Sequence, residues 1–388
     1  MASTKTQDER LAEWNSSVMK YLIPNDVVLS LYLILGTIGN ITVILVYVFK
    51  MKVKRDDRFF IPVLASVDFI ACLIGASFAF TWNIIPVKFS NGIVCEALWF
   101  VSQAVTIISA VLLIIIAVQR YLKVCKPSFI FTQKMKNVCI ILAVCFGFAF
   151  SVPIFFYYGS VEIYNPKLNV TGFWCGQKRE NIDHVIIYDI SAVVVAVIAS
   201  FVLIILYILI GKAIYQKFIV FQQSVKEGKY TKKHRSSVEL ESVLSVDKDK
   251  DSGSSRSRAN SIEDLVECDT YRRKVKRGSA DTLDQGRFFT IGQHFRTHRY
   301  SYMFMTITAL FIIAYTPRLA LMVLESMDPT FWNKPNDAIA GFLFLYRMYI
   351  LNHAINPFIY TFFDTRFRKA VSEIFCCCCS TRKSVSLC

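Results

Sequence analysis

Acidic and basic residues are scarce in seven long stretches of this 388-residue chain, although 19% of the whole sequence is charged. Five stretches contain none: Val27–Phe49, Ala97–Val118, Asn137–Val161, Ile190–Gly211 and Tyr300–Pro317. Two more, Phe59–Trp82 and Ala338–Phe363, are interrupted only by Asp68 and Arg347. Together with a 54% share of hydrophobic residues, these stretches exclude an ordinary soluble domain. About 20 apolar residues cross a bilayer as a helix, so the sequence predicts an all-α bundle of seven membrane spans.

The sequence shows neither a cleavable signal peptide nor an internal repeat. Met1–Tyr21 is polar, so we expect the first span itself to direct insertion. A seven-span transporter would need paired carboxylates or inverted repeats with broken helices, and only Asp68 is acidic at mid-membrane depth. An intramembrane enzyme would need a nucleophile with a base or a metal cluster, and His353 has no histidine or carboxylate near it in the sequence. We therefore expect no enzyme, and transport is the weaker alternative.

The net charge of +15 comes from basic residues that are concentrated beside particular spans. The loops after the first and third spans carry Lys50, Lys52, Lys54, Arg55, Arg58, Arg120, Lys123, Lys126, Lys134 and Lys136. By contrast, the loop after the second span has only Lys88. By the positive-inside rule, the basic loops lie in the cytoplasm and the N-terminus is extracellular, as in a multi-pass protein of the plasma membrane. Charges that flank spans are typical of topology signals, so no nucleic-acid partner is expected.

Two kinds of residue agree with this orientation. Asn15 and Asn169 begin N-glycosylation sequons in segments that are predicted to be extracellular. Of the twelve cysteines, only Cys95 and Cys175 fall on the predicted outer side, where a disulfide can form and persist. The sequence thus predicts a glycoprotein in which a disulfide can form on the extracellular side.

The cytoplasmic segments differ in composition. A long loop between spans five and six is rich in serine and in charges of both signs, which predicts disorder. After span seven, apolar residues on one side of 364–375 predict an amphipathic helix on the inner leaflet. The following Cys376, Cys377, Cys378 and Cys379 cannot surround one zinc ion tetrahedrally, which favours palmitoylation. The predicted segments are the extracellular tail 1–26, spans one to five in 27–222, the disordered loop 223–294, spans six and seven in 295–363, and the cytoplasmic tail 364–388.

Polar side chains within the spans are costly in lipid and tend to face the interior of the bundle. They are Asn40, Asp68, Ser109, Asn352, His353 and Asn356. A carboxylate that faces amides and a hydroxyl suits a small hard cation such as Na⁺. A water-filled polar network that holds the helices together explains the same residues, so both interpretations stay open.

Two further positions stand out by their place in a span. Asn356-Pro357 lies inside span seven, where proline removes a backbone hydrogen bond, so the pair predicts a movable joint whose freed carbonyl is bonded by a neighbouring helix. Arg120 lies 25 positions after Cys95, and at about 1.5 Å for each residue this distance reaches from one membrane face to the other. Span three would therefore carry a cysteine at its outer end and an arginine at its inner end.

Taken together, these features resemble the rhodopsin-like class of G protein-coupled receptors over all seven spans. The matching residues are Gly39-Asn40, Leu64-Ala65 with Asp68, Cys95, Arg120-Tyr121, Tyr207, Phe311, Pro317 and Asn352 through Tyr360. The resemblance implies a receptor in which an extracellular ligand moves span six outward at its inner end, so that a heterotrimeric G protein binds and exchanges its nucleotide. Kinases, arrestin and membrane lipids are further expected partners.

The resemblance also implies roles for single residues. Cys95 and Cys175 would form the disulfide that holds the second extracellular loop over the ligand pocket. Residues that would rearrange on activation or form the switch are Arg120, Tyr121, Tyr207, Pro317 and Tyr360. Residues that would hold Na⁺ in the resting state, together with Asn40 of the polar network, are Asp68, Ser109, Asn352 and Asn356. Apart from this structural Na⁺, no cofactor is expected.

Several positions depart from the family pattern. Gln119 replaces the acidic residue before Arg120, and 293–299 offers no carboxylate to Arg120 either, so we expect measurable ligand-independent signalling. Tyr315 replaces the family's tryptophan in span six, and Ala199 replaces the proline of span five. These departures leave open a receptor-like protein that does not signal.

The expected pocket argues for an acidic ligand. Receptors for cationic amines use a carboxylate where this chain has Ser102, and visual pigments use a lysine where it has Ile350. By family geometry the pocket contains Ser102, Gln103, Tyr315, Arg318, Tyr346, Arg347 and Tyr349. Two arginines among phenols suit a carboxylate or another acceptor-rich group, so a neuropeptide is the first expectation and a small or lipid acid the second. In the alternative interpretation, the arginines extend to the lipid headgroups.

Overall fold

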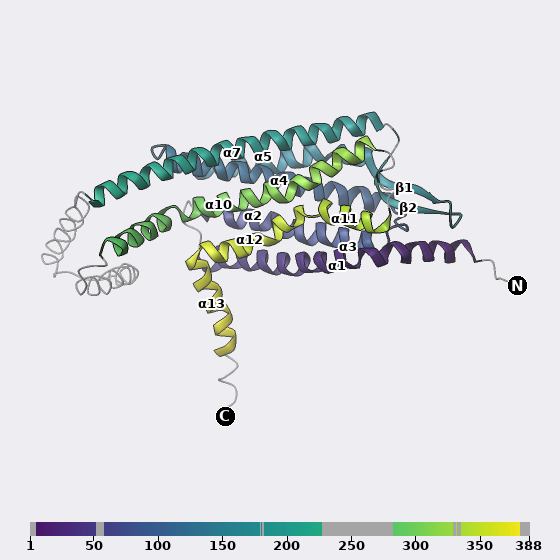
Figure 1. Cartoon of the computed structure of the whole chain (residues 1–388), viewed down its shortest axis with the longest axis horizontal. Coiled ribbons are helices and arrows are strands. Elements are labelled where there is room, and N and C mark those ends of the chain that lie inside the picture. The colour runs from purple at the N-terminus through teal and green to yellow at the C-terminus, as the bar shows by residue number, and fades with distance from the viewer. Residues whose placement is uncertain are drawn as a thin grey trace, which may run out of the picture. The chain divides into compact units, whose positions relative to one another are not determined.

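The computed structural model describes residues 5–51, 58–178, 180, 182–226, 282–328, 331 and 335–380 (Figure 1). The chain divides into two units, Met1–Ile210 with Tyr300–Cys388, and Gly211–Arg299. The second unit holds the end of one long helix and the beginning of another. The loop predicted to be disordered at 223–294 falls largely on 227–281, which lie outside the described residues. At both ends of that loop the described chain is helical, up to Lys226 and from Thr282.

Seven spans are confirmed. Among the described residues, six helices are long and apolar enough to cross a membrane, and a bent pair near the C-terminus provides the seventh span. The helices are α1 (Gln7–Leu45), α2 (Phe60–Ile70), α3 (Ser77–Ile84), α4 (Gly92–Cys125), α5 (Gln133–Ser151), α6 (Ile154–Tyr157), α7 (Ile182–Lys226), α10 (Thr282–Met327), α11 (Asn336–Tyr346), α12 (Tyr349–Phe363) and α13 (Thr365–Ser380). Two π-helical segments, η1 (Val46–Lys50) and η3 (Ala71–Ala76), continue α1 and join α2 to α3.

Large apolar side chains remain exposed along the outward faces of several spans. Ile38 on α1, Leu142 on α5 and Phe201 on α7 are each more than 60% exposed. Apolar surface of this extent is costly in water but suits hydrocarbon, where each helix satisfies its own backbone hydrogen bonds. These faces therefore contact lipid, and the polar side chains of the spans turn inward.

The first helix begins well before the predicted first span. α1 starts at Gln7, where the Thr6 side chain accepts a hydrogen bond from the backbone N–H of Glu9 and the Glu9 side chain accepts one from the N–H of Thr6. This capping box satisfies two donors that the start of a helix otherwise leaves unpaired. Much of the predicted tail 1–26 is thus helical, because good capping lets the helix start in polar sequence.

Span seven bends at a position that the sequence did not indicate. α11 and α12 meet at an angle of 45° around Arg347 and Met348, whereas α12 runs without a break through Pro357. Pro357 cannot bond the carbonyl of His353, and the Nδ2 of Asn40 donates to that carbonyl at 2.9 Å. The neighbouring helix thus supplies the predicted replacement bond, but the bend lies elsewhere.

Gly39 explains how α1 and α12 come so close. A Cβ atom at this position would lie 2.8 Å from Cγ of Pro357, well inside van der Waals contact. Glycine is therefore required for a packing reason, and the adjacent Asn40 is brought within reach of the freed carbonyl.

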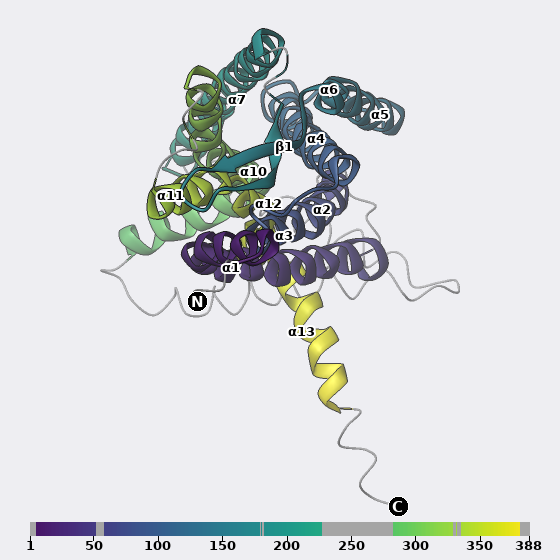
Figure 2. The same ribbon diagram turned by 90° about the vertical axis from the view of Figure 1, so that its right-hand side faces the viewer.

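A β-hairpin interrupts the otherwise helical chain and was not predicted. β1 (Tyr158–Asn165) pairs antiparallel with β2 (Val170–Gln177), and Ser160 stands opposite Cys175. The predicted fourth apolar stretch reached Val161, but α5 ends at Ser151, shortly before Pro153, and the strand begins at Tyr158. Figure 1 shows the hairpin at one end of the helices and α13 toward the other, and Figure 2 looks onto the hairpin. We call these the hairpin end and the α13 end.

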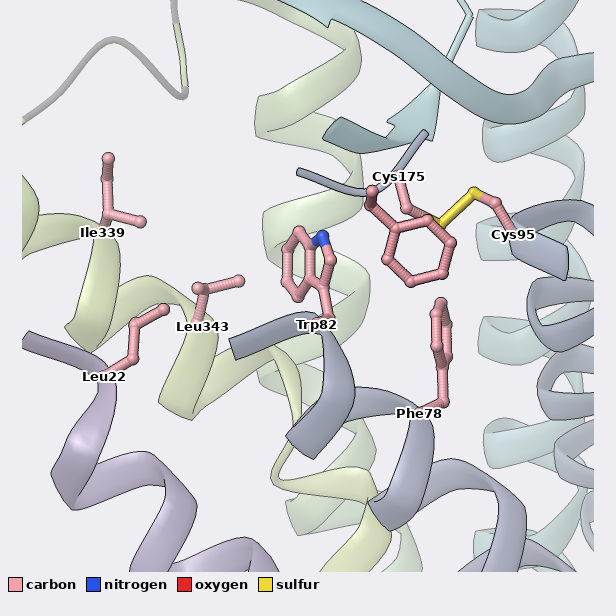
Figure 3. Packing of buried hydrophobic residues seen from close by; sticks show 8 residues of the cluster. Leu22, Phe78, Trp82, Cys95, Cys175, Ile339 and Leu343 are labelled. Carbon is pink, nitrogen blue, oxygen red and sulfur yellow. A yellow bond between two sulfur atoms is a disulfide. The ribbon is translucent and has the colours of Figure 1, made fainter. Parts of the chain in front are cut away.

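An apolar cluster lies beneath the hairpin (Figure 3). It consists of Leu22, Phe78, Trp82, Phe89, Cys95, Cys175, Ile339 and Leu343. Its members come from α1, α3, α4, α11, β2 and the loop before α4, so the hairpin is packed against the helices and is not a free loop.

Candidate functional site

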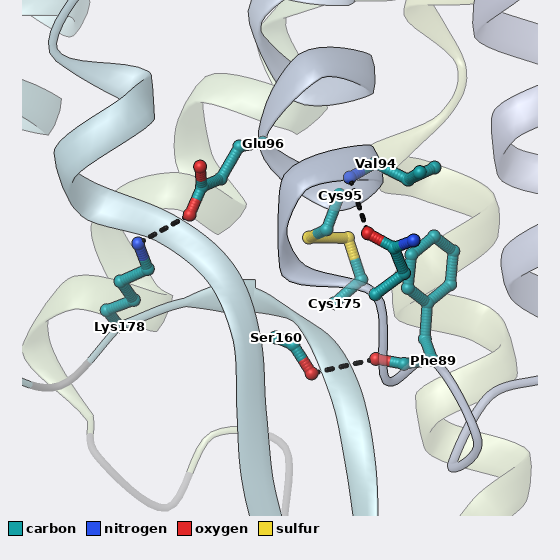
Figure 4. The surroundings of a disulfide bond; sticks show 8 residues. Phe89, Val94, Cys95, Glu96, Ser160, Cys175 and Lys178 are labelled. Carbon is teal, nitrogen blue, oxygen red and sulfur yellow. Dashed lines mark hydrogen bonds and ion pairs between the residues drawn. A yellow bond between two sulfur atoms is a disulfide. The ribbon is translucent and has the colours of Figure 1, made fainter.

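The hairpin is fixed to α4 by covalent and polar bonds (Figure 4). Cys95 and Cys175 form a disulfide between positions 80 residues apart, which confirms the pairing implied by the family resemblance. Lys178 pairs with Glu96 at 2.7 Å, and the hydroxyl of Ser160 donates to the carbonyl of Phe89 at 2.8 Å. The disulfide is buried, so the hairpin covers the ends of the helices in one fixed register.

Asp189 makes a second attachment that sequence analysis missed. Its buried carboxylate accepts hydrogen bonds from Gln177 at the end of β2 (2.7 Å) and from Ser326 on α10 (2.6 Å). The Gln177 amide also donates to the phenol of Tyr158, whose pKa is raised well above its usual value by burial and by the charge of Asp189. Asp189 directly precedes the uncharged stretch of span five. An acidic residue at that position was the one feature of the sequence that could have pointed to it.

Arg318 lies among tyrosine rings in the interior of the bundle. Only 2% of it is exposed, and its guanidinium carbon is 4.2 Å from the ring centroid of Tyr349. The rings of Tyr346 and Tyr315 lie at 5.4 and 5.8 Å. Its Nη2 donates to Oε1 of Gln103 at 3.0 Å, whereas Nε and Nη1 have no hydrogen-bond partner among the described residues. A buried cation that keeps two free donors is costly, which makes this group suited to an anion from outside the chain.

Arg347 is buried in the same way at the bend of span seven. It donates to Oδ1 of Asn83 at 2.7 Å, and Nδ2 of Asn83 in turn donates to Asp26 at 2.7 Å. Its guanidinium lies 4.7 Å from the ring of Trp82, and its Nη2 has no partner within the described part of the chain. Both predicted arginines therefore point into the bundle and do not extend to lipid headgroups.

Two cavities adjoin these residues. One lies beneath the hairpin, is no larger than about one water molecule, and is lined by Trp82, Trp99, Tyr158, Trp174, Glu325 and Tyr346, among others. The other, equally small, lies between η3, α4 and α12 and includes Ser102 and Tyr349. The indole N–H groups of Trp82 and Trp99 and the hydroxyl of Ser102 are buried without a partner among the described residues. Of the predicted pocket residues, Ser102, Tyr346 and Tyr349 line these cavities. Arg318 joins Gln103 to the three tyrosines, whereas Arg347 contacts Asn83 and Trp82.

A polar network surrounds Asp68 at mid-depth. Nδ1 of His353 lies 2.8 Å from one carboxylate oxygen, and Nδ2 of Asn356 donates to the other at 2.7 Å. His353 therefore contacts Asp68 directly. From the sequence, His353 was expected only to belong to the polar network. Four oxygens of the predicted polar residues are buried without a partner among the described residues: Asn40 Oδ1, Ser109 Oγ, Asn352 Oδ1 and Asn356 Oδ1. Unpaired oxygens near a carboxylate fit a hard cation.

Most of the predicted switch residues lie toward the α13 end, whereas Pro317 lies beside Arg318 in the other half of α10. Arg120 is buried, its Nη2 donates to Oε1 of Gln119 at 3.3 Å, and its guanidinium lies 5.2 Å from the ring of Phe304 on α10. Thr308, one turn further along α10, donates to the phenol of Tyr207 at 3.3 Å. Tyr360 is fully buried, and Pro317 lies inside the unbroken α10. Gln119 thus provides the neutral partner at Arg120, where the family has an acid.

The predicted modification sites differ in accessibility. Asn169 is exposed in the hairpin turn at a φ of 44°, and Tyr164 donates to its side-chain oxygen. Asn15 lies on α1, where its Nδ2 donates to the carbonyl of Ile84 at 2.9 Å. Cys376 to Cys379 lie on α13, but their side chains lie outside the described residues. Glycosylation and palmitoylation therefore stay predictions, and Asn169 has the more accessible amide.

Comparison with known proteins gives a consistent result. The family described as 7 transmembrane receptor (rhodopsin family) matches residues 39–360. Cholecystokinin receptor type A of Cavia porcellus is 23% identical over 379 residues, which cover 94% of this chain and 82% of that receptor. The human neuropeptide S receptor is 22% identical over 163 residues, 42% of this chain, and the match spans only 44% of that receptor. Because the family match covers most of its length and reaches from the first span to the last, this chain belongs to the rhodopsin family of seven-transmembrane receptors.

Proposed function

We propose that this protein is a plasma-membrane receptor with an extracellular N-terminus, which binds a peptide through an acidic group and activates a heterotrimeric G protein. The observation that carries the proposal is the buried guanidinium of Arg318, which keeps two donors unpaired among the described residues. A carboxylate accepts charge-assisted hydrogen bonds from the N–H groups of a guanidinium, whose planar set of donors a lysine does not offer.

A peptide suits the surrounding groups better than a small acid. Unpaired donors also occur on Arg347, Trp82 and Trp99, so they extend from the centre of the bundle to the space beneath the hairpin. One small carboxylate can accept hydrogen bonds from the donors at only one of these positions. A peptide presents a row of carbonyl oxygens beside its carboxylate and can therefore bond donors at several of them. Two relatives are named for neuropeptide S and cholecystokinin, which agrees with this ligand class.

The path from ligand to G protein runs through α10. Arg318 and Phe304 lie on this one helix, about 21 Å apart along its axis. Arg318 would contact the ligand, and Phe304 and Thr308 contact Arg120 and Tyr207. A ligand that binds more tightly when α10 is displaced shifts the protein toward that arrangement by its difference in affinity. The cleft opened near Arg120 is then the G-protein site.

Nucleotide exchange tests the proposal. Membranes that contain the full chain are combined with a panel of purified heterotrimers, and GTPγS uptake is measured with peptide extracts before and after protease digestion. We expect a protease-sensitive stimulation that is absent in Arg120→Ala at equal surface expression. Protease-resistant stimulation would indicate a small acid instead. Exchange that is the same in Arg120→Ala under every stimulus would overturn the receptor mechanism.

We further propose that the network around Asp68 binds Na⁺ in the resting state. The four unpaired oxygens on Asn40, Ser109, Asn352 and Asn356 fit such an ion, which would supply positive charge beside the Asp68 carboxylate. The contact of His353 with Asp68 matters here, because a protonated imidazole would take the place of the cation.

Replacing Na⁺ by N-methyl-D-glucamine at constant ionic strength should therefore raise basal exchange in the wild type and leave Asp68→Asn unchanged. His353→Asn keeps a hydrogen-bonding side chain but cannot carry a proton charge, so it should retain or strengthen the response to Na⁺. An equal response to Na⁺ in wild type and Asp68→Asn would show that the polar groups only hold the helices together.

At the α13 end we propose that palmitoylated cysteines anchor α13 to the inner leaflet. Phe367 on the apolar side of this helix stacks on Tyr47 at 5.5 Å between ring centroids. On its other side, Glu373 pairs with Lys50 at 2.7 Å, and this hydrogen bond lowers the pKa of the Glu373 carboxyl. Such a helix lies along a membrane surface, and acyl chains at its end add the second attachment that stable anchoring needs.

A further inference from the structure

A second buried ion pair lies at the α13 end, away from Arg120. Asp364, between α12 and α13, is fully buried, and its Oδ2 accepts hydrogen bonds from the phenols of Tyr47 (2.8 Å) and Tyr300 (3.0 Å). The Nε of Arg58 lies 3.5 Å from the same oxygen. The carboxylate therefore joins the end of span one, the segment before α2, and α10.

Tyr300 links the two charges of this pair. Its phenol donates to Asp364 and accepts a hydrogen bond from Nε of Arg58 at 2.6 Å. The guanidinium of Arg58 also lies 5.5 Å from the Tyr300 ring. Burial by itself lowers the pKa of Arg58, but the charge of Asp364 and the contacts with Tyr300 outweigh it, so the pKa is raised overall. We call Arg58, Tyr300 and Asp364 the Asp364 cluster.

We propose that the Asp364 cluster holds α10 in the resting arrangement. The inference rests on the proposed function, because it assumes that displacement of α10 activates the receptor. Tyr300 lies one turn from Phe304 and two turns from Thr308, the residues of α10 that contact Arg120 and Tyr207. Displacing this part of α10 breaks the bond from Tyr300 to Asp364, whereas Tyr47 and Arg58 keep their contacts with the carboxylate.

A purely structural role for Asp364 makes a different prediction. In that case the cluster only fixes α13 to spans one and two, and the two phenols that bond Oδ2 are equivalent. Tyr47 is the matched control, because Tyr47→Phe removes one phenol bond to the same oxygen but lies on η1 and not on α10. Tyr300→Phe removes the other bond, together with the acceptor of the Arg58 Nε hydrogen bond, and keeps the ring in place.

The test compares Tyr300→Phe with Tyr47→Phe in the full-length receptor in nanodiscs. Hydrogen–deuterium exchange of the α10 amides near residue 300 reports the cluster without any G protein, and basal GTPγS uptake reports signalling. Loss of a hydrogen bond to a charged group shifts a two-state equilibrium about tenfold, so both rates should rise by up to that factor in Tyr300→Phe and stay near wild type in Tyr47→Phe. In Tyr300→Phe/Asp364→Asn the increase should be no larger than in the stronger single variant, because both act on one contact.

Each outcome decides a separate question. Faster amide exchange without a change in GTPγS uptake supports the cluster and counts against the proposed signalling function. Equal amide exchange in the two tyrosine variants, or no change in either, overturns the cluster as a restraint on α10. Melting temperatures of the variants identify general destabilisation, which would accelerate amide exchange throughout the bundle and not only along α10.

Discussion

Replacing Arg318 by glutamine should lower agonist potency by about two orders of magnitude or more. Removing a buried guanidinium that pairs with a ligand carboxylate typically costs about 2–5 kcal/mol of binding free energy. The receptor itself should fold normally, because Arg318 is only 2% exposed and two of its donors have no partner in the described part of the chain. Removing such a buried charge is often neutral or stabilising. The measurement is the concentration dependence of GTPγS uptake with the protease-sensitive extract at equal surface expression.

The chemistry of the contact can be separated from its charge. Arg318→Lys keeps the positive charge but loses the planar pair of donors, so its potency should fall between wild type and Arg318→Gln. Methyl esterification of the extract neutralises carboxylates and should weaken the wild type while leaving Arg318→Gln with little further loss. If esterification weakened both receptors equally, the acidic group of the ligand would bind elsewhere, and Arg347 would be the next candidate.

Removing the disulfide should have the second-largest effect. The double variant Cys95→Ala/Cys175→Ala should lose about 2–4 kcal/mol of stability, because the bond joins positions 80 residues apart. Agonist potency should fall as well, since β2 would lose its covalent link to α4. It would then be held by hydrogen bonds and ion pairs such as Gln177–Asp189 and Lys178–Glu96. Melting of the purified receptor followed by tryptophan fluorescence measures the first effect.

The matched control uses a cysteine outside this bond. Cys145 on α5 is exposed on the outward face of the bundle, so Cys145→Ala should melt as the wild type does. Reducing agent should lower the melting temperature of wild type and Cys145→Ala alike and leave the double variant unchanged. If the double variant melted at the same temperature as the wild type, packing alone would be shown to hold the hairpin in place.

The sequence alone was enough to predict features that follow from local periodicity or from the chemistry that a single residue requires of its neighbours. The seven apolar stretches predicted the spans, because a bilayer requires long uncharged helices. Pro357 predicted a freed carbonyl that needs a donor from another helix, and Asn40 is that donor. Two cysteines on the predicted outer side marked where a disulfide could form, and the structure joins them.

The tertiary structure decided what depends on contacts between distant positions. Asp189, Asn83 and Asp364 looked like ordinary polar residues near the ends of apolar stretches, and only folding placed them against Gln177, Arg347 and Arg58. The hairpin and the bend at Arg347 were not predicted either, because short strands and helix breaks are set by packing against neighbours as much as by local preference. The sequence by itself determined the spans and the chemical types within them. The packing of the bundle decided which partner each charged group contacts, because a buried charge is tolerated only where other helices bring matching groups.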